Sequence, residues 1–234
     1  MRADTTPAGP AVHRSGPGRQ GVVPMALVTL GLIPLVAGLL RLVQLAGGPD
    51  LMPADPRFAS TSAPLVAHIV GAGVFVLVGA LQFVPALRRR GRRWHRLAGR
   101  VVVASGLTVG LSAIWMTLLY PQKAGTGDVL FVLRLGFGSA LIGCLVLGVV
   151  AIRGHDVDTH RAWMMRAYAI GLGAGTQALT EGVSGALFGH GALRDDLAKG
   201  MGWVINLAVA EWFIRRGARP RPDVAATARA GAHR

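Results

Sequence analysis

Charged residues are scarce in this chain of 234 residues: Asp, Glu, Lys and Arg make up 15% of it, whereas about 25% is usual for a globular domain. Apolar residues contribute 52%, and the mean hydropathy is +0.47. So few polar residues cannot cover a water-facing surface, and the same composition excludes intrinsic disorder. The composition therefore predicts an integral membrane protein.

Cysteine and lysine are nearly absent. The single cysteine, Cys144, excludes an internal disulfide, and a lone cysteine in an apolar run usually packs as a small hydrophobic side chain. Only two of the 25 basic residues are lysines, which is typical of a GC-rich bacterial genome. The sequence also contains no G-x-S-x-G, Walker A or H-E-x-x-H motif, so nothing in it indicates hydrolase chemistry.

What the chain does contain is a series of long apolar runs and no strand pattern. A membrane-spanning helix needs about 17–25 mostly apolar residues, and an all-helical bundle satisfies its backbone within the bilayer. We therefore expect an all-α, polytopic bundle of six transmembrane helices, between a disordered tail (1–21) and a basic tail (215–234). The expected helices are 22–46, 64–87, 97–120, 129–152, 162–188 and 197–214, of which the last is the shortest and contains Lys199.

The basic residues predict the orientation of these helices. The net charge is +14, but the basic residues lie in short blocks between apolar runs. With the N-terminus inside, nineteen Arg fall in cytoplasmic segments, against Arg57, Lys123, Arg194 and Lys199 outside. We therefore expect cytoplasmic termini in a bacterial plasma membrane. The lipid bilayer is the expected partner, and nucleic acid is not.

Two expected helices carry small residues at helical spacing. The second has His68, Gly71, Phe75, Gly79 and Gln82 on one stripe, and the third has Gly99, Gly106, Gly110 and Ala113. Such stripes admit either a neighbouring helix or a flat cofactor. Tight helix packing is the simpler interpretation of the glycines.

Polar residues within the expected helices form two groups, and such residues usually face the bundle interior. The outer group is His68, Arg41, Arg134, Gln177 and Glu181. Because Arg134 and Glu181 are expected at similar depth, we predict that they form an ion pair. The alternative is that the arginines extend to the lipid headgroups.

The inner group opens the third and fifth expected helices. His95 and His160 fall at one depth on different helices, so they could ligate a haem iron, while Arg96, Arg100, Arg161 and Arg166 could neutralise its propionates. Tyr168 and Gln82 would then be hydrogen-bond partners of that site. The alternative is that these are interfacial residues that cap helices or contact headgroups; Asp158 or Thr159 suits a helix N-cap.

A resemblance follows from several short motifs. They are His68 with Gly71 and Gln82-Phe83, Trp94-His95-Arg96 with Gly99-Arg100, the stretch from His160 to Tyr168 (HRAWMMRAY), and Asn206 with Ala210-Glu211-Trp212. Over roughly residues 20–215 the chain resembles the bacterial membrane-protein family called domain of unknown function 2306. This family has no assigned reaction, so the resemblance implies the bundle and these residues but no activity.

A looser similarity relates the chain to haem-carrying bundles of the cytochrome b561 and ferric-reductase type. It implies a b-type haem held by His95 and His160, and a redox partner or a quinone. Two other classes stay open: a proton-coupled transporter of small solutes, with its site at His68, Arg134, Gln177 and Glu181, and a membrane assembly protein without catalysis, whose glycine stripes form dimer faces.

Overall fold

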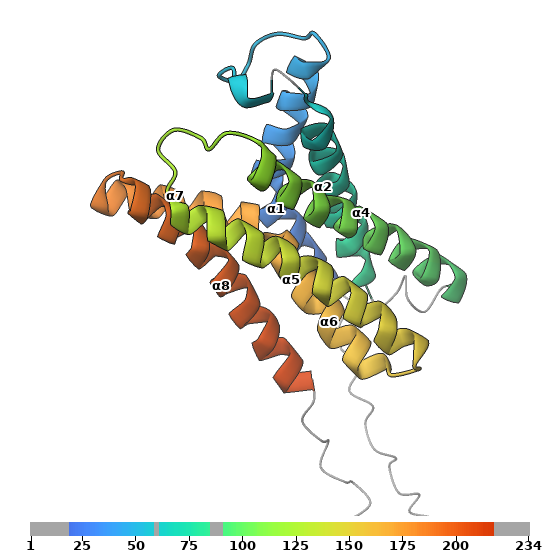
Figure 1. The fold of residues 1–234 in the computed structure, drawn as a ribbon. Helices are drawn as coiled ribbons and strands as arrows, with labels where there is room; N and C mark the ends of the chain where they lie inside the picture. Colours follow the sequence, from blue (N-terminus) through green and yellow to red (C-terminus); the bar gives the residue numbers. More distant parts are fainter. Residues whose placement is uncertain (1–18, 59–60, 85–90, 218–234) are drawn as a thin grey trace, which may run out of the picture.

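The computed structural model describes residues 19–58, 61–84 and 91–217, and within these ranges every regular element is helical (Figure 1). Of the expected tails, 1–21 and 215–234, residues 1–18 and 218–234 lie outside the described residues. The elements are α1 (Arg19–Leu45), the short 3-10 helix η1 (Pro56–Phe58), α2 (Ala63–Gln82), α4 (Arg92–Leu119), α5 (Asp128–Arg153), α6 (Val157–Gly171), α7 (Gly173–Phe188) and α8 (Ala192–Gly217).

The largest difference from the sequence-based prediction is in the fifth apolar run, which is two helices, α6 and α7, divided at Leu172. The flanking glycines explain the break: a Cβ at Gly171 would overlap the ring of Phe75, and a Cβ at Gly173 would overlap the indole of Trp203. Glycine is a poor helix former, and its lack of a side chain lets Phe75 of α2 and Trp203 of α8 pack closely against the junction of α6 and α7.

Helix ends also differ from the expected ones. α6 begins at Val157 because the Asp156 carboxylate accepts the backbone N–H of Thr159 at 3.0 Å, so the expected cap at Asp158 or Thr159 is wrong. The hydrogen bond from the Thr159 N–H also holds the pKa of Asp156 below its usual value. α1 begins at Arg19, inside the expected tail, and α8 begins at Ala192 and continues to Gly217.

The helices pack mainly as neighbours in the chain: α2 against α4, α5 against α6 and α7 against α8, while α1 lies against α2 and α7. The N-terminal part of α8 returns to the start of α5, where Asp196 accepts the N–H groups of Gly127 and Leu130 at 3.0 Å. α6 and α7 together therefore run back along the length of α5 (Figure 1).

By length and composition, five of the described helices could cross a membrane: Met25–Leu45 of α1, α2, Arg93–Leu119 of α4, α5 and α8. α6 and α7 have 15 and 16 residues, so each alone is too short to span the bilayer. Large apolar side chains such as Leu111, Val132 and Leu187 are exposed on the outside of the bundle. This apolar exterior is what a surface in contact with lipid requires.

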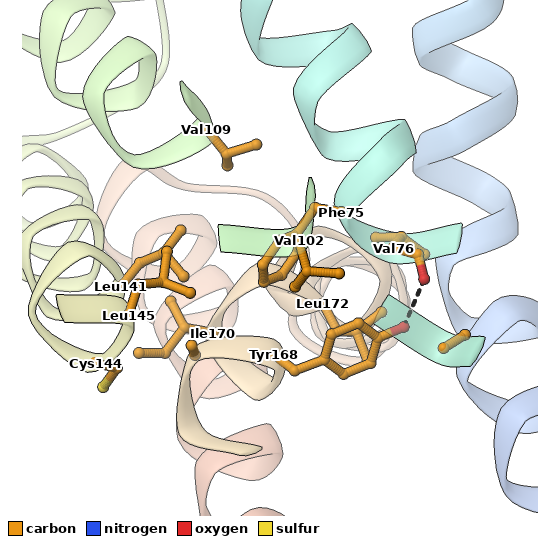
Figure 2. Close-up of a cluster of buried hydrophobic side chains, with 12 residues drawn as sticks. Phe75, Val76, Val102, Val109, Leu141, Cys144, Leu145, Tyr168, Ile170 and Leu172 are labelled. Atoms are coloured by element: carbon orange, nitrogen blue, oxygen red, sulfur yellow. Dashed lines mark hydrogen bonds between the residues drawn. The ribbon is translucent and has the colours of Figure 1, made fainter. Parts of the chain in front are cut away.

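The core lies where α2, α4, α5 and α6 meet. Phe75 and Leu145 are completely buried there, and the Tyr168 hydroxyl donates to the carbonyl of Val76 at 2.8 Å (Figure 2). The tyrosine ring lies against Gly79, where a Cβ would overlap it. Protein side chains therefore fill the space beside this glycine stripe.

On α4 the glycines differ from one another. A Cβ at Gly106 would overlap Phe75 and Leu145, and a Cβ at Gly110 would come within 2.7 Å of Ile142. A Cβ at Gly99 would meet nothing within 4 Å. The interpretation as tight helix packing thus holds for Gly106 and Gly110, but Gly99 takes no part in it.

Candidate functional site

A cavity of about 300 Å³ opens near the end of the bundle where α5 begins. Three residues of the predicted outer group line it: His68 from α2, Arg134 from α5 and Gln177 from α7. The remaining wall is mostly apolar and includes Val109, Met116, Leu141, Phe137 and Trp203, of which the last two stack with ring centroids 4.6 Å apart. The structure therefore joins polar groups from distant parts of the chain around one apolar space.

Arg134 is the central charge of this cavity. Its side chain is half-buried and makes no hydrogen bond or ion pair with any residue that the structure describes. The nearby charges that act on it are Asp196, which attracts it, and Arg57, which repels it. A guanidinium has five N–H donors and stays protonated in proteins, so Arg134 can receive an anion.

Gln177 and His68 add hydrogen-bonding groups. The Nε2 atom of Gln177 is buried and has no partner in the described part of the chain. His68 Nδ1 lies 3.0 Å from Ser112 Oγ, whose own O–H has the carbonyl of Thr108 at 2.6 Å as acceptor. This contact fixes the His68 ring between α2 and α4.

Glu181 and Arg41 lie outside this cavity. Glu181 pairs with Lys199 at 2.8 Å, so the expected ion pair between Arg134 and Glu181 is wrong. The reason is that α7 and α8 are antiparallel neighbours, which brings Lys199 beside Glu181. Arg41 donates to Gln44 at 2.9 Å and to the carbonyl of Pro53 at 3.0 Å, and it thereby fixes the segment after α1.

The short helix η1 and the end of α4 line one part of the cavity. Arg57 of η1 binds both carboxylate oxygens of Asp55, at 2.8 and 2.5 Å, and this guanidinium lowers the pKa of Asp55. Phe58 contacts Tyr120 edge to face, and the Tyr120 hydroxyl donates to the carbonyl of Thr61 at 2.6 Å. Sequence reasoning did not select Asp55 and Phe58 because they lie in a connecting segment, where no periodicity marks them. It used Arg57 only to predict the orientation and Tyr120 only as the end of an expected helix.

Asp196 is the most buried charged residue among those described, with no exposed surface. Its Oδ2 atom accepts the N–H groups of Gly127 and Leu130, whereas Oδ1 has no described partner. Sequence analysis did not select Asp196. The available signal was a pair of acidic residues, Asp195 and Asp196, at the start of an otherwise apolar run.

The inner group is not gathered around one space. The Arg166 guanidinium binds Glu211 through two contacts of 2.5 and 3.2 Å and lies 4.7 Å above the Trp163 ring. Tyr168 is buried in the core, and the Oε1 atom of Gln82 is buried without a described partner. Arg166 and Tyr168 are therefore already engaged by the protein.

The other inner residues lie at the ends of helices. His160 places Nδ1 2.8 Å from the carbonyl oxygen of Gly148, and His95 lies half-buried in the first turn of α4. The remaining three residues of the group are exposed: Arg96 and Arg100 on α4, and Arg161, which lies beside Gly217. Of this group, His160 has the clearest orientation for holding a ligand.

A comparison with protein families gives a match. Residues 65–214 match the model of the family described as "Predicted membrane protein (DUF2306)". The chain belongs to this family. The matched region covers α2 to α8 almost completely, including every α-helix that lines the cavity, whereas η1 lies before it. No curated protein matches the chain, and no solved structure does.

Proposed function

We propose that this member of the DUF2306 family is a small-solute transporter that binds an organic anion with an apolar body in the cavity beside Arg134. The observation that carries this proposal is Arg134, which lines a mostly apolar cavity and has no ion-pair partner among the described residues. Removing a charge from water without a partner is costly, so such residues usually mark a binding site.

The lining explains the class of ligand. A carboxylate or a similar anion can accept two parallel hydrogen bonds from Arg134, and the free Nε2 of Gln177 can donate a further one. The aromatic and aliphatic walls favour an apolar body. Because the lining is mostly apolar, the charge on Arg134 acts more strongly than it would at a surface.

The proposed topology has six membrane passes, with α6 and α7 together forming one of them and both termini in the cytoplasm. The return of α8 to the start of α5 supports this count, and the distribution of arginines supports the orientation. A cysteine placed at Lys123, with Cys144 replaced by Ala, should react in whole cells with a maleimide that cannot cross membranes. A cysteine at His155 should react only after lysis, and the reverse pattern would contradict the orientation.

The binding proposal predicts a large effect of one substitution. Arg134→Gln should weaken binding of benzoate to the detergent-purified protein about 10- to 150-fold, because a hydrogen bond to a charged group contributes about 1.5–3 kcal/mol. Isothermal titration calorimetry measures the change. The matched control is Arg194→Gln, since Arg194 is exposed and donates to the carbonyl of Phe188.

Benzamide, the uncharged analogue, tests whether the anion is recognised. It should bind weakly to the unaltered protein and equally weakly to Arg134→Gln. Decanoate separates the two sources of such an anion, since an acyl chain from the bilayer should bind better than a soluble aromatic acid if lipid supplies the ligand. Benzoate binding that is unaffected by Arg134→Gln would refute the proposal.

A second candidate function is the binding of b-type haem by His160 and His95, and the orientation of His160 favours it. If Nδ1 donates to the Gly148 carbonyl, Nε2 is left as the ligating atom, as in many metal-bound histidines. The haem would supply one-electron chemistry. The purified protein, made with haem precursor available, should then show a Soret band that His160→Ala and His95→Ala remove. His155→Ala is the control, and a protein-only spectrum of folded protein would contradict this function.

A further inference from the structure

The hydrogen bonds of Ser112 determine which nitrogen of the His68 ring carries a hydrogen. Ser112 Oγ lies 2.6 Å from the carbonyl oxygen of Thr108, a separation at which two oxygens attract each other only if a hydrogen lies between them. A carbonyl has no hydrogen to give, so the serine hydroxyl donates there. Towards His68 Nδ1, which is 3.0 Å away, Ser112 Oγ can then act only as an acceptor. Nδ1 therefore carries a hydrogen.

The other ring nitrogen, Nε2, is left as an acceptor. The ring lines the same mostly apolar cavity as Arg134, where a second positive charge would be unfavourable, so the imidazole is neutral and has one donor and one acceptor nitrogen. The carbonyl of Val109, 3.1 Å from Ser112 Oγ, is a further acceptor for the ring on the side of α4. Nε2 lies on a different edge of the ring and has no hydrogen bond within the described ranges.

The His68 nitrogen complements the other polar groups that line the cavity. Arg134 and the amide nitrogen of Gln177 are donors, so both suit the carboxylate of a ligand. Thr117 and Tyr120 also line the cavity, but their hydroxyls already donate to backbone carbonyls, at 2.7 and 2.6 Å. A hydroxyl oxygen is a weaker acceptor than the bare nitrogen of an imidazole. His68 is therefore the group best suited to receive a hydrogen from the ligand.

We propose that the bound anion is a phenolic carboxylate, whose carboxylate binds Arg134 and whose ring hydroxyl donates to Nε2 of His68. This inference rests on the proposed function, because it requires an anion at Arg134. The stacked rings of Phe137 and Trp203 in the cavity wall favour an aromatic body over an aliphatic one. A phenol keeps its hydrogen at neutral pH, since its pKa is about 10, whereas the carboxyl group of the same molecule is ionised.

Calorimetry with matched ligands tests the proposal on the unaltered, detergent-purified protein. Either meta- or para-hydroxybenzoate, whichever spans the two groups, should bind about 3- to 10-fold more tightly than the corresponding fluorobenzoate, which is the effect of one neutral hydrogen bond. Fluorine is nearly as large as a hydroxyl group but cannot donate. ortho-Hydroxybenzoate is the control, because its hydroxyl donates to its own carboxylate, and it should bind no more tightly than ortho-fluorobenzoate.

Two variants identify the acceptor. His68→Asn places an amide N–H where the Nδ1–H lies, so it can keep the bond to Ser112, but it has no counterpart of Nε2. The preference for hydroxybenzoate over fluorobenzoate should therefore disappear. Thr117→Val removes the competing hydroxyl oxygen and should leave the preference as it is. Because the preference is a ratio of two Kd values on one protein, a general weakening of binding cancels from it.

Nuclear magnetic resonance examines the ring itself. In protein labelled with nitrogen-15 histidine, a bare ring nitrogen and one that carries hydrogen give separate signals, and the signals lost in His68→Asn belong to His68. Nε2 should be the bare nitrogen in the free protein. Its signal should shift when the preferred hydroxybenzoate is added and shift much less with the fluorobenzoate.

Several results would overturn the inference while leaving the proposed function intact. They are equal affinity for the hydroxybenzoate and the fluorobenzoate in both isomers, a preference that persists in His68→Asn, a preference that is lost in Thr117→Val, and a hydrogen on Nε2 of His68 in the free protein. The first of these needs no variant, so the test stands even if His68→Asn fails to fold. Absence of binding by decanoate and by every benzoate would instead refute the proposed function and this inference with it.

Discussion

Replacing Gly175 with alanine should markedly lower the thermal stability of the protein. A Cβ at this position would overlap the backbone carbonyl of Leu30, which places α1 and α7 in direct backbone contact. A side chain can rotate away from an added methyl group, but a carbonyl within a helix cannot. The two helices would have to separate, at a cost of about 1–3 kcal/mol. Thermal unfolding of the purified protein, followed by circular dichroism, measures the effect.

Gly182 supplies the matched control on the same helix. A Cβ there would meet nothing within 4 Å, and alanine is the better helix former by about 1 kcal/mol. Gly182→Ala should therefore leave the melting temperature unchanged or raise it. Equal losses in both variants would contradict the close contact between α1 and α7.

Asp196→Ala should destabilise the start of α5 by about 2–4 kcal/mol, because the buried N–H group of Leu130 and the partly buried N–H group of Gly127 lose their acceptor. Hydrogen exchange at these two amides should accelerate, and the melting temperature should fall. Asn retains an acceptor oxygen, so Asp196→Asn should cost much less than the alanine variant. The difference in stability between the two variants separates the effect of the lost acceptor oxygen from the effect of the lost negative charge.

The neighbouring residue provides the comparison. Asp195 is also acidic, but its partner His190 is 73% exposed, and surface ion pairs contribute about 0–1 kcal/mol. Asp195→Ala should therefore have a small effect on stability. If the two alanine variants were equally unstable, the capping of α5 by Asp196 would be refuted.

The sequence predicted the helical class well because the signal is physical and redundant. Each apolar run is long enough to span a bilayer, and the observed α5 differs from the expected 129–152 by one residue at each end. The break at Leu172 was not predictable in the same way. It depends on Phe75 and Trp203, whose approach to Gly171 and Gly173 only the folded bundle reveals.

The candidate site was partly predictable. Depth along the helices placed His68, Arg134 and Gln177 at one level, and the structure brings all three to one cavity. Depth says nothing about which way a side chain points around its helix, so the pairing of Glu181 was missed. Depth along the helices also could not select Asp196, because its role is to accept a backbone N–H from Leu130, which lies 66 residues earlier in the chain.

The cap on α5 also has a consequence for biosynthesis. Leu130 leaves the ribosome 66 residues before Asp196, which at about 5–20 residues per second is a delay of roughly 3–13 s. During that interval the start of α5 has no carboxylate to satisfy its N–H groups, and in lipid such groups have no other acceptor. The last of the described helices to be translated therefore completes the first turn of a helix made long before it.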